Sequence, residues 1–182
     1  MLRLHISDSE IFNEKTNSFE YINSEDLMLE HSLISISKWE SLWKKPYLVD
    51  TAKTDDEFLS YIQCMTINSV RNEKIYYSLN MSQKQQIINY INDSMTATWF
   101  SKRSNNPPGS REIVTSEVIY YWMIKAAVPF ECEKWHLNRL LTLLRVCGAK
   151  DSKGSKKMSR KEIYSQNAAL NAMRRKQLNT LG

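Results

Sequence analysis

Glycine and proline are scarce in this chain of 182 residues, which contains four of each. All-β sandwiches and barrels need many tight turns, and tight turns rely on these two residues. The scarcity therefore favours a mainly helical fold. Hydrophobic residues make up 42% of the chain and charged residues 25%, as in ordinary globular proteins. A chain of this length is expected to form one domain with an appendage.

Long apolar runs are also missing. The longest, Val118 to Ile124, has seven residues, whereas a membrane-spanning helix needs about 18. The opening residues, MLRLHISDSE, contain no apolar core of the length that a signal peptide requires. The three cysteines are widely spaced and odd in number, a pattern typical of reduced proteins rather than disulfide scaffolds. We therefore expect a cytoplasmic protein that does not contact a membrane.

The common catalytic motifs do not occur in the sequence. There is no G-x-x-x-x-G-K-[ST] and no G-x-G-x-x-G, the loops that hold phosphate groups, and no G-x-S-x-G, the turn that presents a nucleophilic serine. The sequence thus predicts a protein that is not an enzyme, with no catalytic residue, no cofactor-binding residue and no cofactor.

Positive charge is concentrated near the C-terminus. The net charge of the chain is +5, but residues 150–182 contain nine lysines and arginines against only Asp151 and Glu162, a net of +7. The remaining 149 residues therefore carry −2. Such an uneven distribution indicates a basic arm that interacts with a partner. A solvated, partly ordered tail without a partner is the alternative.

The first 31 residues have the pattern of a small β element. LRLHI alternates apolar and polar residues, and EIFNEKTNSFEYI has two short apolar runs around a polar turn, which predicts a hairpin. Leu27 and Leu29 continue the alternation, and Leu33 could extend it.

A helical pattern follows. Ile36, Trp39 and Trp43 share one helical face, and Pro46 ends that helix. Three capping boxes predict helix starts, and they are TDDE at 54–57, SQKQ at 82–85 and SRKE at 159–162. They would open helices over about 54–66, 82–92 and 159–176. SKRSNNPPGS, residues 101–110, predicts a loop.

A further helix is expected over 115–127. Its Val118 to Ile124 run is apolar on all sides, so we expect this helix to lie in the centre of the protein.

PFECEKWHLNRLLTLLRVC, residues 129–147, holds two cysteines and a histidine and is the obvious candidate for a metal or catalytic site. Laid on one helix ending at Gly148, Cys132, His136 and Cys147 fall on the apolar arc. The cysteines are then about 22 Å apart, too far to share a metal. Cys132 and His136 would supply only two of the three or four ligands that zinc needs. Structural packing is the favoured interpretation, and we predict no metal site.

Two aromatic residues suggest nucleic-acid binding. Trp39 and Trp43 are one helical turn apart beside Lys44 and Lys45, so they could form an aromatic-basic patch. Packing of both rings in the core is the favoured alternative.

Six strings resemble, in the same order, a family of siphophage and prophage proteins identified as tail assembly chaperones. They cover about Leu29 to Lys176, and they are LEHSLISISKWESLW, YIQCMTI, MTATWFS, SREIVTSEVIYYWMI, PFECEKWHLNRLLTLLRVC and KKMSRKEIYSQNAALNAMRRK. The resemblance implies a helical protein of the host cytoplasm that binds the tape measure protein and keeps it soluble while tube subunits polymerise around it. The tail tube protein and a frameshifted longer form of the chain are further implied partners. The family has no catalytic or metal residues to transfer.

Together these observations predict an α+β, predominantly α-helical protein with three segments. They are an N-terminal β-hairpin element over 1–31, a helical core over 32–148 and a basic linker with a C-terminal helix over 149–182. The candidate partner-binding residues are Arg139, Arg145, Lys156, Lys157, Arg160, Lys161, Arg174, Arg175 and Lys176. The alternatives are a structural or connector protein of the virion tail or neck, and a nucleic-acid-binding protein that uses the basic arm.

Overall fold

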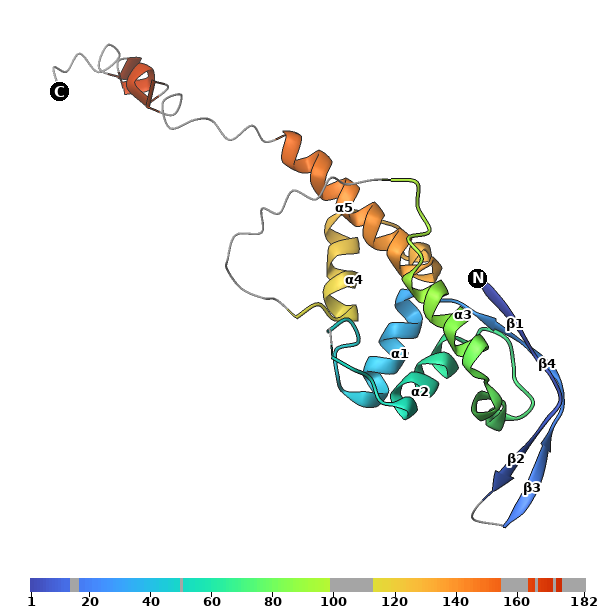
Figure 1. The fold of residues 1–182 in the computed structure, drawn as a ribbon. Helices are drawn as coiled ribbons and strands as arrows, with labels where there is room; N and C mark the ends of the chain where they lie inside the picture. The colour runs from blue at the N-terminus through green and yellow to red at the C-terminus, as the bar shows by residue number, and fades with distance from the viewer. Residues whose placement is uncertain are drawn as a thin grey trace. The chain divides into compact units, whose positions relative to one another are not determined.

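A computed structural model describes residues 1–13, 17–49, 51–98 and 113–154, and within the C-terminal segment residues 164–165, 167–171 and 173–174. The fold is α+β, with strands first and helices after them, as predicted (Figure 1). Met1–Val146 forms one compact unit and Cys147–Gly182 a second. The strands and the helical core therefore belong to the same unit. The predicted loop at 101–110 and the capping box at 159–162 lie outside the described residues.

Four strands form two antiparallel pairs. β1 (Leu2–Ile6) pairs with β4 (Glu25–Leu29), and β2 (Ser9–Asn13) pairs with β3 (Ser18–Ile22). The second pair continues from the first as one long ribbon (Figure 1). This confirms the hairpin predicted from EIFNEKTNSFEYI.

One face of the first strand pair joins the hydrophobic core. Leu4 stands opposite Leu27, and Leu2 opposite Leu29, so these residues share a face. Leu4, Ile6, Leu27 and Leu29 are buried. The alternation stops at Leu29, because Leu33 is the first residue of a helix and not the end of a strand.

The central helix is α1 (Leu33–Trp43), which contacts α2, α4 and the 3₁₀ helix η2. It begins at a capping box in which Ser32 and Ser35 satisfy each other's backbone N–H groups, and Lys44 ends it in the left-handed conformation. Leu33, Ile36 and Trp39 are buried against the surrounding elements. The face predicted from Ile36, Trp39 and Trp43 is thus confirmed.

Two of the predicted helix starts can be compared with the structure. Thr54 and Glu57 form the predicted capping box of α2 (Asp55–Met65). For α3 (Met81–Asn92) the prediction was wrong by two residues, because Asn80 and Gln83 form the box and Ser82 lies inside the helix. An asparagine caps a helix at least as well as a serine. Between these helices, Glu73–Ser78 forms the 3₁₀ helix η1.

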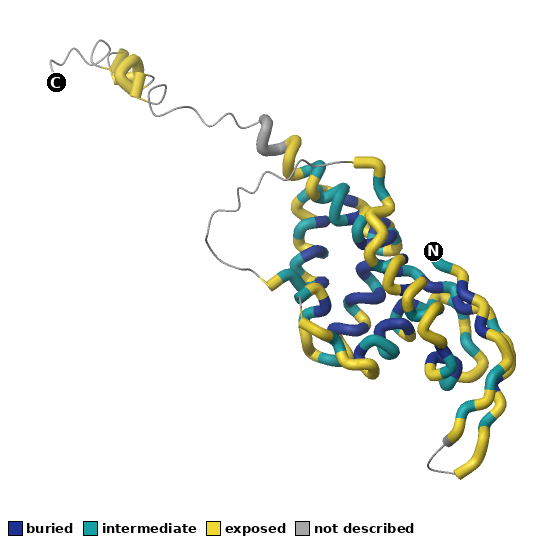
Figure 2. Tube along the Cα trace, viewed as in Figure 1, coloured by how far each residue is buried: buried dark blue, intermediate teal, exposed yellow. Residues whose placement is uncertain are grey.

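The helix α4 (Ser116–Lys125) is not buried on all sides, which corrects the prediction for the Val118 to Ile124 run. Ile119 and Met123 are fully buried, but Tyr121 and Ile124 are 59% and 64% exposed. The exposed side of α4 is visible in Figure 2. α4 packs on α1 along a single face, and the position at the centre of the core belongs to α1.

Residues 129–147 do not form one helix, which corrects a second prediction. Phe130–Lys134 is the 3₁₀ helix η2, Trp135 is extended, and α5 runs over Leu137–Gly154. Cys132 and Cys147 therefore do not share a helix, and the distance argument based on one helix does not hold. Nor does Gly148 end α5, because a C-cap glycine needs a positive φ and Gly148 has none.

A buried carboxylate joins α1 to α4. The Oε1 atom of Glu40 accepts a hydrogen bond from the backbone N–H of Tyr47 at 2.9 Å. Its Oε2 atom accepts from the backbone N–H of Ser116 at 2.8 Å and from the Ser116 hydroxyl at 2.6 Å. Thr115, at the N-cap position of α4, makes no side-chain cap, so Glu40 supplies the acceptor from another helix.

Replacing Glu40 by alanine should strongly destabilise the first unit, because it leaves three buried donors without an acceptor. We expect a loss of about 2–5 kcal/mol in the free energy of unfolding, measured by urea denaturation. Glu131→Ala, which removes an exposed carboxylate, is the matched control and should change stability by less than about 0.5 kcal/mol. Equal stability of the two variants would show that Glu40 does not hold α4 in place.

Candidate functional site

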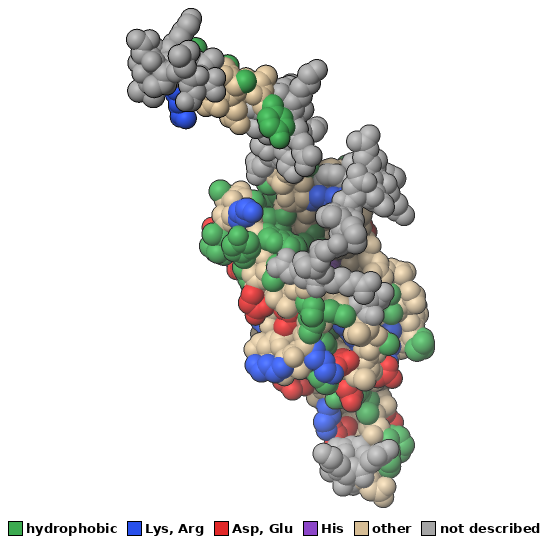
Figure 3. All heavy atoms as spheres, turned by 90° about the vertical axis from the view of Figure 1, so that its left-hand side faces the viewer, with side chains coloured by type: hydrophobic (Ala, Val, Ile, Leu, Met, Phe, Trp, Pro, Cys, Tyr) green, Lys and Arg blue, Asp and Glu red, His purple; other side chains and the backbone are tan. Residues whose placement is uncertain are grey.

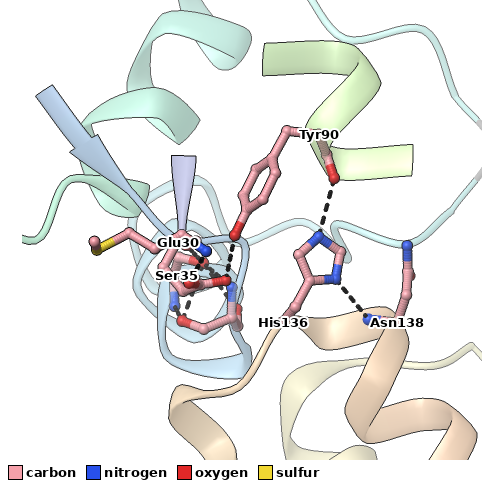
Figure 4. A network of polar contacts seen from close by, with 7 residues as sticks. Glu30, Ser35, Tyr90, His136 and Asn138 are labelled. Atoms are coloured by element: carbon pink, nitrogen blue, oxygen red, sulfur yellow. Dashed lines mark hydrogen bonds and ion pairs between the residues drawn. The ribbon is translucent and has the colours of Figure 1, made fainter. Parts of the chain in front are cut away.

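A network of buried polar residues lies where the end of β4, the start of α1 and the start of α5 meet (Figure 4). His31 and His136 are 2% and 6% exposed, and their ring centroids are 5.0 Å apart. Ser32 and His136 form an isolated antiparallel bridge, and the N–H of Leu137 donates to the carbonyl of His31 at 2.7 Å. The two histidines therefore come together through backbone pairing between distant parts of the chain.

Both ring nitrogens of His136 are engaged. Nε2 lies 3.0 Å from the carbonyl of Tyr90, which can only accept, so Nε2–H donates. Nδ1 accepts from the backbone N–H of Asn138 at 3.3 Å, in the first turn of α5. His136 thus caps α5 through Nδ1 and is a buried, hydrogen-bonded residue, which agrees with the packing interpretation of this stretch.

Two further contacts tie α3 to this network. The Tyr90 hydroxyl donates to Glu30 Oε1 at 2.6 Å, and the N-terminal ammonium lies 2.8 Å from Glu30 Oε2. The Asn138 amide donates to the carbonyls of Ile91 and Asp93 at 3.0 and 2.7 Å, so it satisfies acceptors at the end of α3.

His31 is surrounded by aromatic rings. Its Nδ1 lies 2.5 Å from the Tyr61 hydroxyl, and Tyr61 stacks on Tyr47 with ring centroids 4.0 Å apart. Burial raises the pKa of Tyr61 well above its usual value, so this hydroxyl keeps its proton. Burial, together with the nearby His136, lowers the pKa of His31 to about 3. The ring is therefore neutral at physiological pH.

The cysteines do not form a site with these histidines. Cys132 is buried in η2, and both nitrogens of His136 are already occupied by backbone groups. Burial raises the pKa of the half-buried Cys64, which disfavours the reactive thiolate. Among the described residues, no three His, Cys, Asp or Glu side chains come close enough to hold a metal ion.

The two tryptophans pack inside the protein instead of forming an open patch. Trp39 is buried and its Nε1–H donates to the carbonyl of Glu57 at 2.9 Å. Trp43 is half-buried, stacks on Trp39 and donates to the Ser60 hydroxyl at 3.0 Å. This confirms the packing interpretation and removes the aromatic part of the nucleic-acid hypothesis.

An open, mainly apolar groove of about 560 Å³ adjoins the histidine network. Its floor includes His31, Tyr47 and Leu137. From α3 it is lined by Ile88, Ile91 and Asn92, and elsewhere by Leu48, Val49, Lys53, Phe58 and Asn138. Leu48 and Ile88, both in the lining, are 36% and 37% exposed. A groove of this size has room for a few large side chains of a ligand or partner.

Among the predicted partner-binding residues that the structure describes in the first unit, neither Arg139 nor Arg145 lines this groove. Arg139 is exposed on α5, and its guanidinium lies 4.3 Å from the ring centroid of Trp135. Arg145 is exposed on the same helix, and Arg174 is exposed in the second unit. Lys156, Lys157, Arg160, Lys161, Arg175 and Lys176 lie outside the described residues. The groove was missed at the sequence level because its lining comes from four separate stretches of the chain.

A second apolar surface lies on α4 and η2. Tyr121, Ile124 and Phe130 are all more than half exposed, and the rings of Tyr120 and Phe130 lie 6.3 Å apart. Figure 3 faces α4 and shows hydrophobic side chains gathered over it. The groove offers a concave lining of about 560 Å³ and is therefore the better candidate site.

No protein-family model, curated protein or solved structure matches this chain. None of the helices in the described part of the chain is long and apolar enough to cross a membrane.

The pKa of His31 predicts that stability depends on pH. Since the folded-state pKa, about 3, lies below the ordinary value of 6.5, the unfolded state binds the extra proton between these values. The stabilisation by the neutral ring is complete above pH 6.5 and is lost as the pH falls toward 3. Between about pH 6 and pH 4 the free energy of unfolding should fall by about 1.4 kcal/mol per pH unit from this residue alone.

Urea denaturation at a series of pH values measures this slope. His31→Gln should reduce the slope by the contribution of one proton. His5→Gln, which changes an exposed histidine paired with Asp26 on the surface, is the control. If the slope of His31→Gln equals that of the unchanged protein, His31 is not the residue that is kept neutral by folding.

Proposed function

We propose that this chain is a non-enzymatic phage tail assembly chaperone, which binds the tape measure protein and keeps it soluble during assembly of the tail tube. Two observations support the proposal. The six strings between Leu29 and Lys176 resemble that family, and the first unit carries an open apolar groove bordered by α3. The groove is the observation on which the binding mode rests.

A partner made of long amphipathic helices fits such a groove. An amphipathic helix binds by placing apolar side chains, spaced three or four residues apart, into a hydrophobic depression. Leu48 and Ile88 would contact these side chains at the surface, and Phe58 and Leu137 would contact them deeper in the groove. The groove is too small to enclose a whole helix, so the partner would remain partly exposed, as an assembly intermediate requires.

Polar groups in the same groove would keep binding reversible. The Lys53 ammonium lies 4.3 Å from the ring centroid of Tyr47, which holds the charge at the groove. Asn92 and Asn138 add amide groups to the lining. Polar groups at an interface favour orientation and exchange over maximal affinity. A chaperone must release its client when the tube protein arrives, so this mixture suits the proposed role.

The proposal includes further partners and a location. The tail tube protein and a frameshifted longer form of the chain would join the complex, in the cytoplasm of the host cell. Arg139, Arg145 and the basic residues from Lys156 to Lys176 would contact acidic parts of the client outside the groove. Arg139 is held for such a contact by its stacking on Trp135.

Replacing Ile88 by glutamate should abolish the chaperone effect, because it places a charge at the mouth of the groove. In co-expression with the tape measure protein, the soluble fraction of the client should fall about tenfold relative to the unchanged chain. Ile124→Glu makes the same chemical change at a more exposed position on α4 and should leave client solubility unchanged. Equal loss in both variants, or a client that stays insoluble with the unchanged chain, would refute the proposal.

The copy number of this chain in finished virions distinguishes a chaperone from a structural or connector protein of the virion. A chaperone leaves once the tube is complete, so purified virions should contain this chain far below one copy per tail. Quantitative mass spectrometry of virions, with the tube protein as internal standard, measures that ratio. A fixed, stoichiometric copy number would instead support the virion structural or connector protein.

A further inference from the structure

The outer face of the β2–β3 ribbon carries an unusual group of exposed aromatic rings. The register pairs Phe12 with Phe19 and Glu10 with Tyr21, so these four side chains share one face. Phe12, Phe19 and Tyr21 are 47%, 70% and 58% exposed. The rings of Phe12 and Phe19 meet edge to face with centroids 5.2 Å apart. The three rings therefore form a small apolar surface that faces solvent.

The opposite face of the ribbon is the one that holds it in place. Ile22 is 1% exposed and Ile11 is half-buried. Glu20, on this inner face, forms an ion pair with Lys74 of η1, and both strands contact η1. The ribbon is thus anchored from behind, and its folding does not require aromatic residues on the outer face. A contiguous apolar patch of this kind usually marks an interaction site.

Acidic residues surround these rings. The segment of residues 1–31 contains seven acidic and two basic residues, a net charge of −5. Glu10 lies on the same face as the rings, and Asp8, whose Oδ1 accepts from the backbone N–H of Ser24, directly precedes β2. Figure 3 shows hydrophobic and acidic side chains next to one another at the end of the molecule that the ribbon forms. The surface suits a basic ligand, because cations are attracted both to carboxylates and to aromatic faces.

The most basic segment available is in this chain itself. Residues 150–182 carry a net charge of +7. At the described positions of this segment, Tyr164, Leu170 and Met173 are exposed, so it offers apolar side chains as well as charge. Residues 32–149 carry only +3, which leaves the two ends of the sequence as its most strongly and most oppositely charged parts.

We propose that the outer face of the β2–β3 ribbon binds the basic C-terminal segment, residues 150–182, of a second copy of this chain. Phe12, Phe19 and Tyr21 contact the apolar side chains of that segment, and Asp8 and Glu10 pair with its lysines and arginines. The resulting contact is heterologous, since each copy offers an acidic ribbon and a basic segment to different neighbours. The proposal does not depend on the chaperone function. The ribbon is separate from the groove, but the basic segment is the one also proposed to contact the client, so on a given copy it binds one or the other.

Cross-linking of the full-length chain tests the contact directly. Equal amounts of unlabelled and ¹⁵N-labelled protein are mixed and treated with a carbodiimide, which joins carboxylates to amines without a spacer. We expect mixed-label peptides that link Asp8 or Glu10 to lysines of residues 150–182, and these should disappear at about 1 M salt, where the Debye length is only about 3 Å. If these links occur only within peptides of one label, the segment binds its own chain and the proposal is overturned. If no link joins Asp8 or Glu10 to residues 150–182, the proposal is overturned as well.

Charge reversal provides an independent test by sedimentation velocity across a concentration series. Glu10→Lys combined with Phe19→Ser should weaken self-association about tenfold or more, and so should reversal of Arg174, Arg175 and Lys176 to glutamate. Mixing these two variants should restore one contact, because the unchanged basic segment of the first can bind the unchanged ribbon of the second, so heterodimers should form although neither variant associates alone. Glu10→Lys combined with Arg174→Glu in one chain should also recover part of the association.

The matched control changes the same residue types elsewhere. Glu131→Lys combined with Phe130→Ser alters an exposed acid and an exposed ring on η2 and should leave self-association unchanged. Circular dichroism checks that the ribbon variant is folded, and the C-terminal reversal tests the contact without touching the ribbon. If the unchanged chain is monomeric at low salt, or if control and ribbon variants associate equally, the proposal is wrong.

Discussion

The hydrogen bond from the backbone N–H of Leu137 to the backbone carbonyl of His31 is the contact on which the first unit depends. It joins the junction between β4 and α1 to the start of α5, more than a hundred positions further along the chain. Beside it, Ser32 and His136 pair as an isolated bridge. Each residue of this junction then has a second role, because Ser32 caps α1 and His136 caps α5. Closing so long a loop costs chain entropy, and the buried hydrogen bonds and rings around the junction offset that cost.

The same junction shapes the candidate site. His31 and Leu137 form part of the groove floor, and Asn138 both lines the groove and binds the carbonyls at the end of α3. The position of α3, and hence of Ile88 and Ile91, is therefore set from the start of α5. The polar network engages both ring nitrogens of His136 and Nδ1 of His31 in hydrogen bonds within the protein. Its contribution is to fix the walls of an apolar surface.

Local signals in the sequence were most reliable where neighbouring residues decide the structure. Thr54 with Glu57 correctly located the start of α2, and the alternation around residues 9–22 correctly predicted the hairpin. The errors arose where a second residue nearby could also cap the helix, or where tertiary contacts override the helical spacing of apolar residues. Asn80 displaced Ser82 as the cap of α3. The Val118 to Ile124 run has no polar side, so its composition could not show that Tyr121 and Ile124 face solvent. Residues 129–147 looked like one helix because their apolar spacing continues across Trp135, where the backbone is extended.

Residue order and composition were enough to predict the class of the fold, the β2–β3 hairpin, the start of α2 and the strong contrast in charge between the two ends of the chain. These features depend on residues close together in the chain, or on composition alone. Three features could be seen only in the folded chain: which helix is central, how His31 and His136 come together, and where the groove lies. Each of these depends on contacts between stretches separated by tens of residues. The aromatic face of the β2–β3 ribbon depends both on the local sequence and on tertiary contacts. Its residues alternate visibly in the sequence, but only packing of the inner face on η1 determines that Phe12, Phe19 and Tyr21 point outward.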